Sequence, residues 1–331
     1  KGGPGVGKST FMGKIAGEML AHGYDVEYHY CSSNPESIDA VAFHSIGVAL
    51  IDGTKPHLID PKYPGAIDEI INLGGFWDES KIIGQKTPIV KITQEIGRTF
   101  GNVYKLLQAA DLYLKALEDY YNLDDYLDKK ARDRLLLELI ENTLEGKSRR
   151  NEAGRVRRLF ASAITPLGTV NHLESLAGNL AHTYVLNGEN GRVKEMITRG
   201  IADAAVRRGF LVEAFCCALD PHIIDHLLIP ELNIGIINSR EPHLFVATGK
   251  STHIDTGEIT CRLPGGLEAE KDDFRRRYQD ALQGGLHYLR KAKALHDELE
   301  SYYIPQMRFD EVDRLVEQTL ERILDWPGKS N

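Results

Sequence analysis

The sequence predicts an α/β protein that is built twice from the same plan. Short apolar segments typical of β-strands alternate with amphipathic segments typical of helices, which indicates sheets covered by helices. Residues 2–58 and 188–244 align without gaps and are identical at 16 of 57 positions. Unrelated sequences of average composition would share roughly 3 or 4. We therefore expect two tandem domains, over residues 1–150 and 151–331.

Composition agrees with a globular chain and excludes several classes of protein. Of the 331 residues, 42% are hydrophobic and 27% charged, and the net charge of −8 argues against a general nucleic-acid binder. No apolar run reaches the ~18 residues of a membrane span. The four cysteines, Cys31, Cys216, Cys217 and Cys261, lack the spacing of metal ligands. These features predict a cytoplasmic protein with reduced thiols.

The first copy begins with a predicted helix, Ser9 to His22, followed by a β-like segment, Asp25 to Cys31. Asn34 and Pro35 suit the start of a further helix. The nearly continuous apolar run Ile46 to Ile51 is typical of a buried parallel strand. Together these elements predict that each copy has a parallel sheet at its core.

A helical hairpin is expected after each sheet. Apolar residues between Ile92 and Leu117 recur at spacings of three and four, which predicts a long helix packed against the helix Ala131 to Leu144. The segment Asp133 to Leu144 resembles Asp313 to Leu324, and each follows a Tyr-Tyr pair. Such hairpins offer surfaces on which a protein partner could bind.

About 30 residues precede the second copy's glycine-rich segment and have no counterpart in this sequence before Lys1. They predict a strand (Leu159 to Ala163), a helix (Asn171 to Gly178) and a strand (His182 to Asn187). By analogy, we expect a similar segment before Lys1, so that the chain is a fragment of a longer protein.

The glycine-rich segment at the start of the chain has the spacing GxxxxGK[ST], the Walker A pattern of a P-loop. Its glycines let successive backbone N–H groups point at one set of phosphate oxygens, at the start of a helix. The lysine reaches the β- and γ-phosphates of the nucleotide. The predicted nucleotide-binding residues are Gly2, Gly3, Pro4, Gly5, Val6, Gly7, Lys8, Ser9 and Thr10.

A magnesium ion would accompany the nucleotide. The Ser9 hydroxyl is placed to bind Mg²⁺, and Asp52, at the end of the apolar run, matches a Walker B acid. His57 could contact the γ-phosphate or orient a water molecule, although the second copy has His243 at the matching place, which favours a structural role. Lys8, Asp52 and His57 are thus the candidate catalytic residues.

The second copy has lost groups that this chemistry needs. Val193, Glu195 and Asn238 stand at the positions of Gly7, Ser9 and Asp52, although Lys194 matches Lys8. A carboxylate in place of the serine would repel phosphate. The second copy is therefore expected to be a scaffold or a regulatory half. The basic stretch between the copies, Arg149 to Arg158, is expected to be a solvated linker or, alternatively, to supply an arginine finger.

Several blocks of the chain are similar to one bacterial family. GGPGVGKST, YDVEYHYCSSNPESID, ALIDGTKPHLIDPKYPGAIDEIINL and LFASAITPLG resemble duplicated P-loop proteins found largely in spore-forming species. Members are described as ATP-binding proteins, ATPases or nucleotide-kinase-like proteins. The resemblance implies ATP binding through Gly2 to Thr10, and family members often have an intact second loop, from which Val193 and Glu195 depart.

The leading expectation is a P-loop ATPase that uses Mg-ATP, and the absence of an NKxD-type motif favours ATP over GTP. One alternative is a kinase whose acceptor would bind at the loops Ser32 to Glu36 and His57 to Gly65. Another is a non-catalytic protein that binds a partner according to its nucleotide state.

Overall fold

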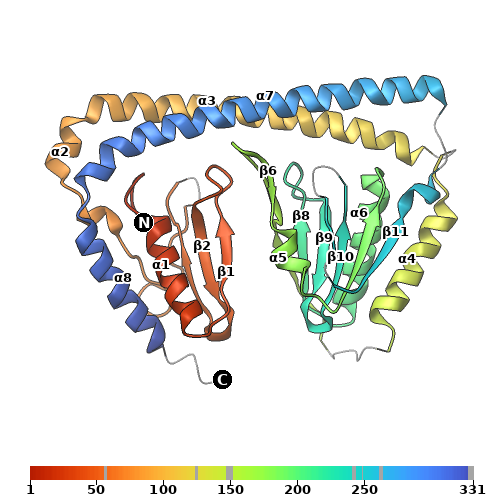
Figure 1. The fold of residues 1–331 in the computed structure, drawn as a ribbon, viewed down its shortest axis with the longest axis horizontal. Coiled ribbons are helices and arrows are strands. Elements are labelled where there is room, and N and C mark those ends of the chain that lie inside the picture. Colours follow the sequence, from red (N-terminus) through yellow and green to blue (C-terminus); the bar gives the residue numbers. More distant parts are fainter. Residues whose placement is uncertain are drawn as a thin grey trace. The chain divides into compact units, whose positions relative to one another are not determined.

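The computed structural model is an α/β protein (Figure 1) and describes residues 1–55, 58–123, 126–146, 152–240, 244–247, 249–260 and 264–326. It divides into two compact units. Unit 1 comprises residues 1–102, 165–167 and 287–331, and unit 2 comprises residues 103–164 and 168–286. Within the described ranges, no helix is both long and apolar enough to cross a membrane.

Unit 1 contains a three-stranded antiparallel sheet beside the first helix. The strands are β1 (Glu27–Tyr30), β2 (Ile38–Phe43) and β3 (Val48–Ile51), in that order across the sheet. Helix α1 (Lys8–Ala21) packs on this sheet through Phe11, Ile15 and Met19, which are almost fully buried. The predicted helix from Ser9 and the predicted strand before Cys31 are therefore confirmed.

Two local predictions in unit 1 are wrong. Pro35 lies in a turn, in which Ser37 N–H donates to the Asn34 carbonyl at 2.8 Å, and the chain then enters β2 directly. Asn34 and Pro35 also suit a β-turn, so their local preference did not distinguish the two structures. Of the run Ile46 to Ile51, only β3 is a strand, and it pairs antiparallel with β2. Ile51 is about half exposed (51%), because no described strand pairs with the outer side of β3.

The last helix of the chain completes the core of unit 1. Helix α8 (Phe309–Leu324) packs on α1, so that Val312, Val316 and Ile323 join the same buried cluster as Ile15. Helix α2 (Glu79–Gly84) precedes the long helix α3 (Lys86–Asp119). In unit 1, Ile89 and Ile92 of α3 pack against Leu299 of α7 (Gly265–Tyr303).

Unit 2 contains a larger, mixed sheet. Its six strands lie in the order β11-β7-β10-β9-β8-β4. Neighbours β11 and β7, β7 and β10, and β8 and β4 are parallel, whereas β9 is antiparallel to both β10 and β8. The strands are β4 (Val156–Leu159), β7 (His182–Asn187), β8 (Val212–Cys216), β9 (Ile224–Ile229), β10 (Ile234–Asn238) and β11 (Ser251–Asp255). The expected parallel cores are therefore found only in part: the sheet of unit 2 is mixed, because β8 and β9 pair as an antiparallel hairpin through residues 217–223, and the sheet of unit 1 is antiparallel.

Helices cover both faces of the unit 2 sheet. Helix α6 (Gly191–Arg207) packs on one face and α4 (Lys129–Leu144) packs on α6, whereas α5 (Leu173–Ala177) lies in the cluster on the other face. A short hairpin, β5 (Ser162–Thr165) and β6 (Gly168–Asn171), forms a separate two-stranded sheet. The helix and the strand predicted at Asn171 to Gly178 and at His182 to Asn187 are confirmed by α5 and β7. The strand predicted over Leu159 to Ala163 is wrong, because β4 ends at Leu159 and β5 begins at Ser162.

Among the described residues, the long helix α3 packs against α7, whereas its predicted partner, α4, packs on α6. In unit 2, Leu106 and Leu107 approach Gly284 and Gly285 closely. The apolar stripe of α3 predicts which face of the helix is buried but not which helix packs on it. Gly284 and Gly285 have no side chain, so α7 can approach this face of α3 closely. Helix α4, which follows α3 in the chain, packs on α6 in unit 2, and α8, which follows α7, packs on α1 in unit 1. The compact units therefore do not follow the expected boundary at residue 150.

Both units repeat one local order of elements: a glycine-rich loop, a helix, and an antiparallel set of three strands. The pairs β1–β2 and β8–β9 share a register irregularity, between His29 and Tyr30 in unit 1 and between Phe215 and Cys216 in unit 2. Gly47 and Asn233 occupy the same left-handed position, at φ 65° and 55°, before the third strand.

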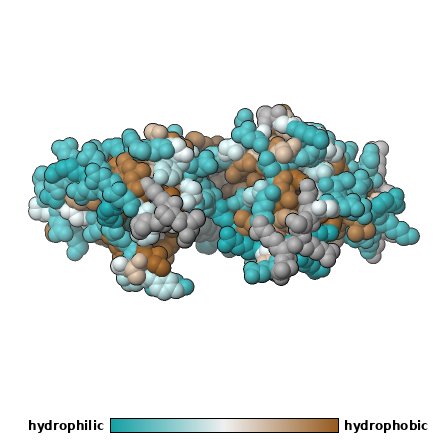
Figure 2. Space-filling model, turned by 90° about the horizontal axis from the view of Figure 1, so that it is seen from below, coloured by the Kyte–Doolittle hydropathy of each residue, from teal (hydrophilic) through white to brown (hydrophobic). Residues whose placement is uncertain are grey.

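The face drawn in Figure 2 is mostly hydrophilic, with separate hydrophobic patches.

Candidate functional site

Loop 1, residues Gly2–Ser9, leads into α1 with a backbone that only glycine adopts readily. Gly5 and Gly7 have φ of 67° and 84°, in the left-handed region. Gly7 is the N-cap of α1, and no side chain of the described residues caps this helix end. The amides of the first turn of α1 therefore lack a side-chain acceptor at the end that carries the positive pole of the helix dipole.

Lys8 folds back over loop 1. Its Nζ donates to the carbonyl oxygens of Gly2 and Gly3 at 3.2 and 2.9 Å, and lies 3.6 Å from an Asp52 carboxylate oxygen. The Lys8 and Asp52 side chains are 18% and 17% exposed, so this ion pair is partly shielded from water. The two charged residues that the sequence predicted are thus brought together at the loop.

Ser9 and Asp52 are also tied to neighbouring backbone. The Ser9 hydroxyl accepts a hydrogen bond from Ile38 N–H at 2.9 Å, and Asp52 accepts one from Thr54 N–H at 2.9 Å. Thr54 Oγ1 donates to the Gly2 carbonyl at 3.1 Å, which joins the end of β3 to the loop. A hydroxyl and a carboxylate suit Mg²⁺, which prefers oxygen ligands. The residues present therefore fit a Mg-nucleotide.

The last turn of α7 and the start of α8 lie against loop 1. Gly5 N–H donates to Glu300 Oε1 at 3.1 Å. A side chain placed on Gly3 would meet Trp77 and Tyr303, and one placed on Gly5 would meet Ile304. The aromatic rings of Trp77 and Tyr303 are themselves in contact, with centroids 5.8 Å apart. The glycines of loop 1 thus allow close approach of protein groups in this structure.

A cavity of about 800 Å³ opens beside loop 1 along the outer edge of β3. Lys8 and Asp52 contribute to its wall, together with apolar residues of β3 and α8. In unit 2 the matching edge of β10 is covered by β7. The cavity therefore results from the unpaired edge of β3 and does not by itself indicate a substrate pocket.

Loop 2, residues Gly188–Glu195, satisfies its own amides. Asn190 is the N-cap of α6, and its side chain accepts a hydrogen bond from Val193 N–H at 3.0 Å. The matching residue in loop 1 is Pro4, which has no such acceptor. The Val193 side chain is fully buried in the core beneath α6, rather than directed at the position where a phosphate would lie.

Lys194 is enclosed by protein. Its Nζ donates to the Gly188 carbonyl at 2.6 Å, and none of the residue is exposed. Burial, and next the nearby positive charge of Arg240, lowers the pKa of Lys194 from 10.5 to about 7. This lysine has the same backbone partner as Lys8 but a drier environment.

An ion pair occupies the position over loop 2. Arg240 donates to a Glu118 carboxylate oxygen at 2.5 Å, and any side chain on Gly191 would collide with both residues. A cavity of about 610 Å³ adjoins this pair, and Asp225 contributes to its wall. Burial raises the pKa of the Asp225 carboxyl group. Over loop 2 the Glu118 carboxylate is thus paired with an arginine, whereas the carboxylate at the matching position of loop 1, that of Glu300, accepts a hydrogen bond from Gly5 N–H.

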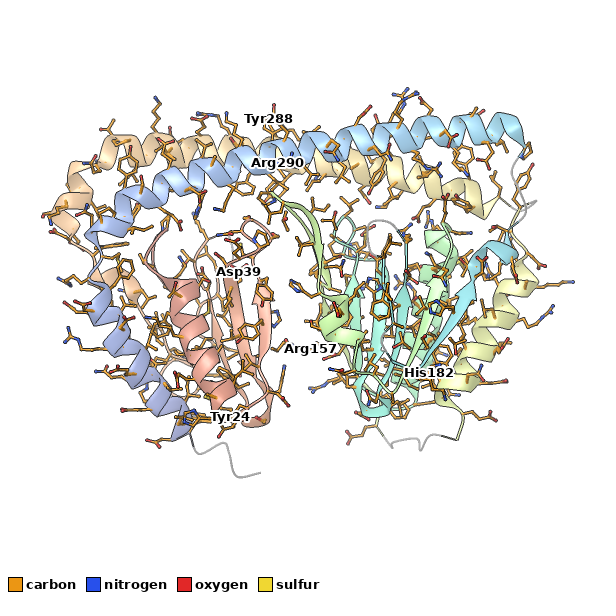
Figure 3. The ribbon with its side chains drawn as sticks, in the orientation of Figure 1. Tyr24, Asp39, Arg157, His182, Tyr288 and Arg290 are labelled. Carbon is orange, nitrogen blue, oxygen red and sulfur yellow. The ribbon has the colours of Figure 1, made fainter. Side chains whose placement is uncertain are left out.

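The other predicted residues have mixed outcomes. His57 lies outside the described residues, as do Arg149 and Arg150. Arg157, on β4 (Figure 3), forms an ion pair with Glu213 of the neighbouring strand at 3.1 Å. Thr10 is exposed on the first turn of α1. In unit 2 Asn238, at the position of Asp52, is buried, and its side-chain oxygen has no hydrogen-bond partner.

Sequence reasoning missed Glu300, Glu118 and Arg240. The two glutamates stand at the same distance before the two Tyr-Tyr pairs, which was a usable signal. Arg240 occupies the position of Thr54, and that exchange appears in the same gap-free alignment. Which loop each glutamate approaches depends on the packing of α3 and α7, which the alignment does not contain.

The geometry defines an α/β protein with a glycine-rich loop at a helix start, a lysine on that loop and an acid at a strand end. Comparison with models of known protein families, with curated proteins and with solved structures finds no match for this chain.

Proposed function

We propose that the chain is a P-loop protein with two tandemly duplicated units, and that loop 1 binds and hydrolyses Mg-ATP. The observation that carries this proposal is the loop 1 geometry. Gly5 and Gly7 have positive φ, the start of α1 has no side-chain cap, and Lys8 lies over the loop at 3.6 Å from Asp52. Backbone amides, a helix dipole and a lysine are the groups that hold a nucleotide's phosphates.

Each residue has a distinct role in this proposal. The loop amides bind phosphate oxygens, and Lys8 moves from the Gly2 and Gly3 carbonyls to neutralise charge on the β- and γ-phosphates. Ser9 and Asp52 would hold Mg²⁺, which would supply positive charge to the phosphates. Loop 2 binds no nucleotide in this proposal, because the Asn190 side chain already caps the start of α6 and the Arg240–Glu118 pair lies over Gly191.

The test is Mg-ATP binding, by calorimetry, and phosphate release, in the wild type and two matched variants. Lys8→Ala should weaken binding by about 30-fold or more, since losing a partly buried charged contact costs about 2–5 kcal/mol. Lys194→Ala should leave ATP affinity unchanged. Equal binding by the wild type and Lys8→Ala would contradict the proposal.

A second candidate function is a nucleotide sensor that binds ATP with negligible turnover. The contact of Glu300, Tyr303 and Ile304 with loop 1 favours it, because the helices α7 and α8 touch the site where a nucleotide would bind. Steady-state turnover separates the two: Lys8-dependent release of phosphate supports the ATPase, and tight binding without release supports the sensor. Turnover that requires an added acceptor would instead indicate a kinase.

A further inference from the structure

The carboxylate of Glu300 lies at loop 1 in a position suited to a phosphate oxygen. It accepts a hydrogen bond from Gly5 N–H at 3.1 Å. To an N–H donor, a carboxylate oxygen and a phosphate oxygen are chemically equivalent acceptors. The backbone carbonyl of Glu300 also lies 3.3 Å from the position that a Cβ on Gly5 would take. The last turn of α7 therefore packs directly on the loop.

We propose that Glu300 is a built-in plug of loop 1, which a nucleoside triphosphate displaces together with the end of α7. The inference rests on the proposed function, because it requires that loop 1 receives phosphates. Without nucleotide, the carboxylate satisfies a loop amide that would otherwise lack a partner. With nucleotide bound, the phosphate takes that amide and its charge repels the carboxylate.

Partial burial makes this competition effective. The Glu300 side chain is 31% exposed, so water screens its charge only in part. On the same helix, His296 Nδ1 lies 3.7 Å from the Glu300 carboxylate. A triphosphate and this carboxylate therefore cannot both lie at the Gly5 amide without strong repulsion.

Displacement of Glu300 would also move Tyr303 and so change its contact with Trp77. Tyr303 follows Glu300 by three residues and contacts Trp77 over Gly3. The chain then continues into α8, which packs on α1. The nucleotide state of loop 1 is thereby transmitted to the end of α7.

Unit 2 provides an internal comparison. Glu118 precedes its Tyr-Tyr pair as Glu300 does, and it lies over Gly191, the residue that matches Gly5. Tyr121 also contacts loop 2, through a 2.8 Å hydrogen bond to Glu189. Glu118, however, is only 7% exposed and is bonded to Arg240. In unit 2 the Glu118 carboxylate is therefore held by the charge of Arg240, whereas in unit 1 the Glu300 carboxylate accepts a hydrogen bond from Gly5 N–H.

The first test needs no nucleotide. Glu300→Ala should raise amide hydrogen exchange of a peptide covering residues 1–10 by about 3- to 10-fold, because Gly5 N–H loses a charged acceptor. It should also raise acrylamide quenching of Trp77 in a Trp326→Phe background, which leaves Trp77 as the only tryptophan. Glu298→Gln, an exposed change on the same helix, is the matched control. Exchange and quenching equal to that control would overturn the plug.

The second test is Mg-ATP affinity. Glu300→Gln keeps the size of the side chain and removes its charge, so ATP should bind about 5-fold more tightly than to the wild type or to Glu298→Gln. ATP binding that depends on Lys8 but is identical in Glu300→Gln would overturn this inference and leave the proposed function intact. If no variant binds ATP, the proposed function is overturned, and so is the displacement of Glu300 by nucleotide.

Discussion

Loops 1 and 2 keep the same lysine and the same lysine–carbonyl contact, yet they differ in almost every group around it. Lys8 lies beside Asp52 and is partly exposed, whereas Lys194 is fully enclosed near Arg240. In loop 1 the helix start is uncapped; in loop 2 Asn190 caps it. A retained lysine therefore does not identify an anion site by itself. The groups around it differ: Asn190 caps the start of α6 and Arg240 holds Glu118 over loop 2, whereas the Glu300 carboxylate at loop 1 is bonded to the Gly5 amide.

The largest expected effect concerns the ion pair over loop 2. Arg240→Ala should lower the free energy of unfolding of unit 2 by about 3–5 kcal/mol, because it leaves the Glu118 carboxylate buried without a partner. Thr54→Ala, at the matching position of unit 1, removes one hydrogen bond and should cost about 1 kcal/mol. Urea unfolding measures both. Equal losses would mean that the two loops have similar surroundings.

The buried lysine of loop 2 should make stability depend on pH. The pKa of Lys194 is about 7 in the folded chain and 10.5 when exposed, so between these values only the unfolded state keeps the proton. The contribution of this group to stability therefore rises with pH across that window, and below about pH 7 the cost of burying the charge is fully present. Lys194→Met should raise stability at pH 6 by about 1–2 kcal/mol.

Thermal unfolding of Lys194→Met between pH 6 and 10 tests this prediction. The variant should show a smaller rise in stability from pH 7 to 10 than the wild type. Lys130→Met changes an exposed lysine of α4 and should follow the wild-type profile. A Lys194→Met profile parallel to that of the wild type would show that Lys194 stays charged in the folded unit.

The conformational requirement of loop 1 is a smaller effect. Gly7→Ala places a side chain at φ 84° and should cost about 1–2 kcal/mol in stability, as should Gly23→Ala at φ 83°. Only Gly7→Ala should also weaken ATP binding, since Gly23 follows the other end of α1. Calorimetric titration with Mg-ATP measures the affinity of both variants. Equal affinities would show that the geometry of loop 1 does not matter for binding beyond the backbone strain that both variants share.

The smallest expected effect is the cap of α6. Asn190→Ala should lower the stability of unit 2 by about 1 kcal/mol, because Val193 N–H loses its side-chain acceptor. Pro4→Ala, the matched change in loop 1, removes no cap and should change stability less. Chemical unfolding curves of the two variants should therefore differ, and coincident curves would contradict the role assigned to Asn190.

The sequence predicted most of the helices, though not the one expected at Asn34 and Pro35, because helix signals are local. The apolar spacing between Phe11 and Met19 and the stop at Gly23 correspond to α1, and the spacing after Ala131 corresponds to α4. Strand direction was predicted less well. Whether Ile46 to Ile51 pairs in parallel depends on its neighbours in the sheet, and an apolar run carries no information on direction.

For the candidate site, too, the sequence predicted local features but not long-range contacts. The sequence alone determined that Gly2 to Ser9 has the spacing of a phosphate loop, and the alignment of the two copies identified the losses at Val193, Glu195 and Asn238. These conclusions need only the conformational range of glycine and the charge of each side chain. The sequence pattern also assigned Lys8 and Asp52 to one site, and the structure places their charged atoms 3.6 Å apart.

Only the tertiary structure decided which helices approach each loop. Glu300 reaches Gly5 from a residue almost 300 positions away in the chain, and Glu118 and Arg240 meet over Gly191 in the same manner. The stripe of α3 fits several helical partners equally well, and its pairing with α7 follows from packing of the whole chain. Long-range packing of this kind depends on shape and close approach, which no local pattern of residues encodes.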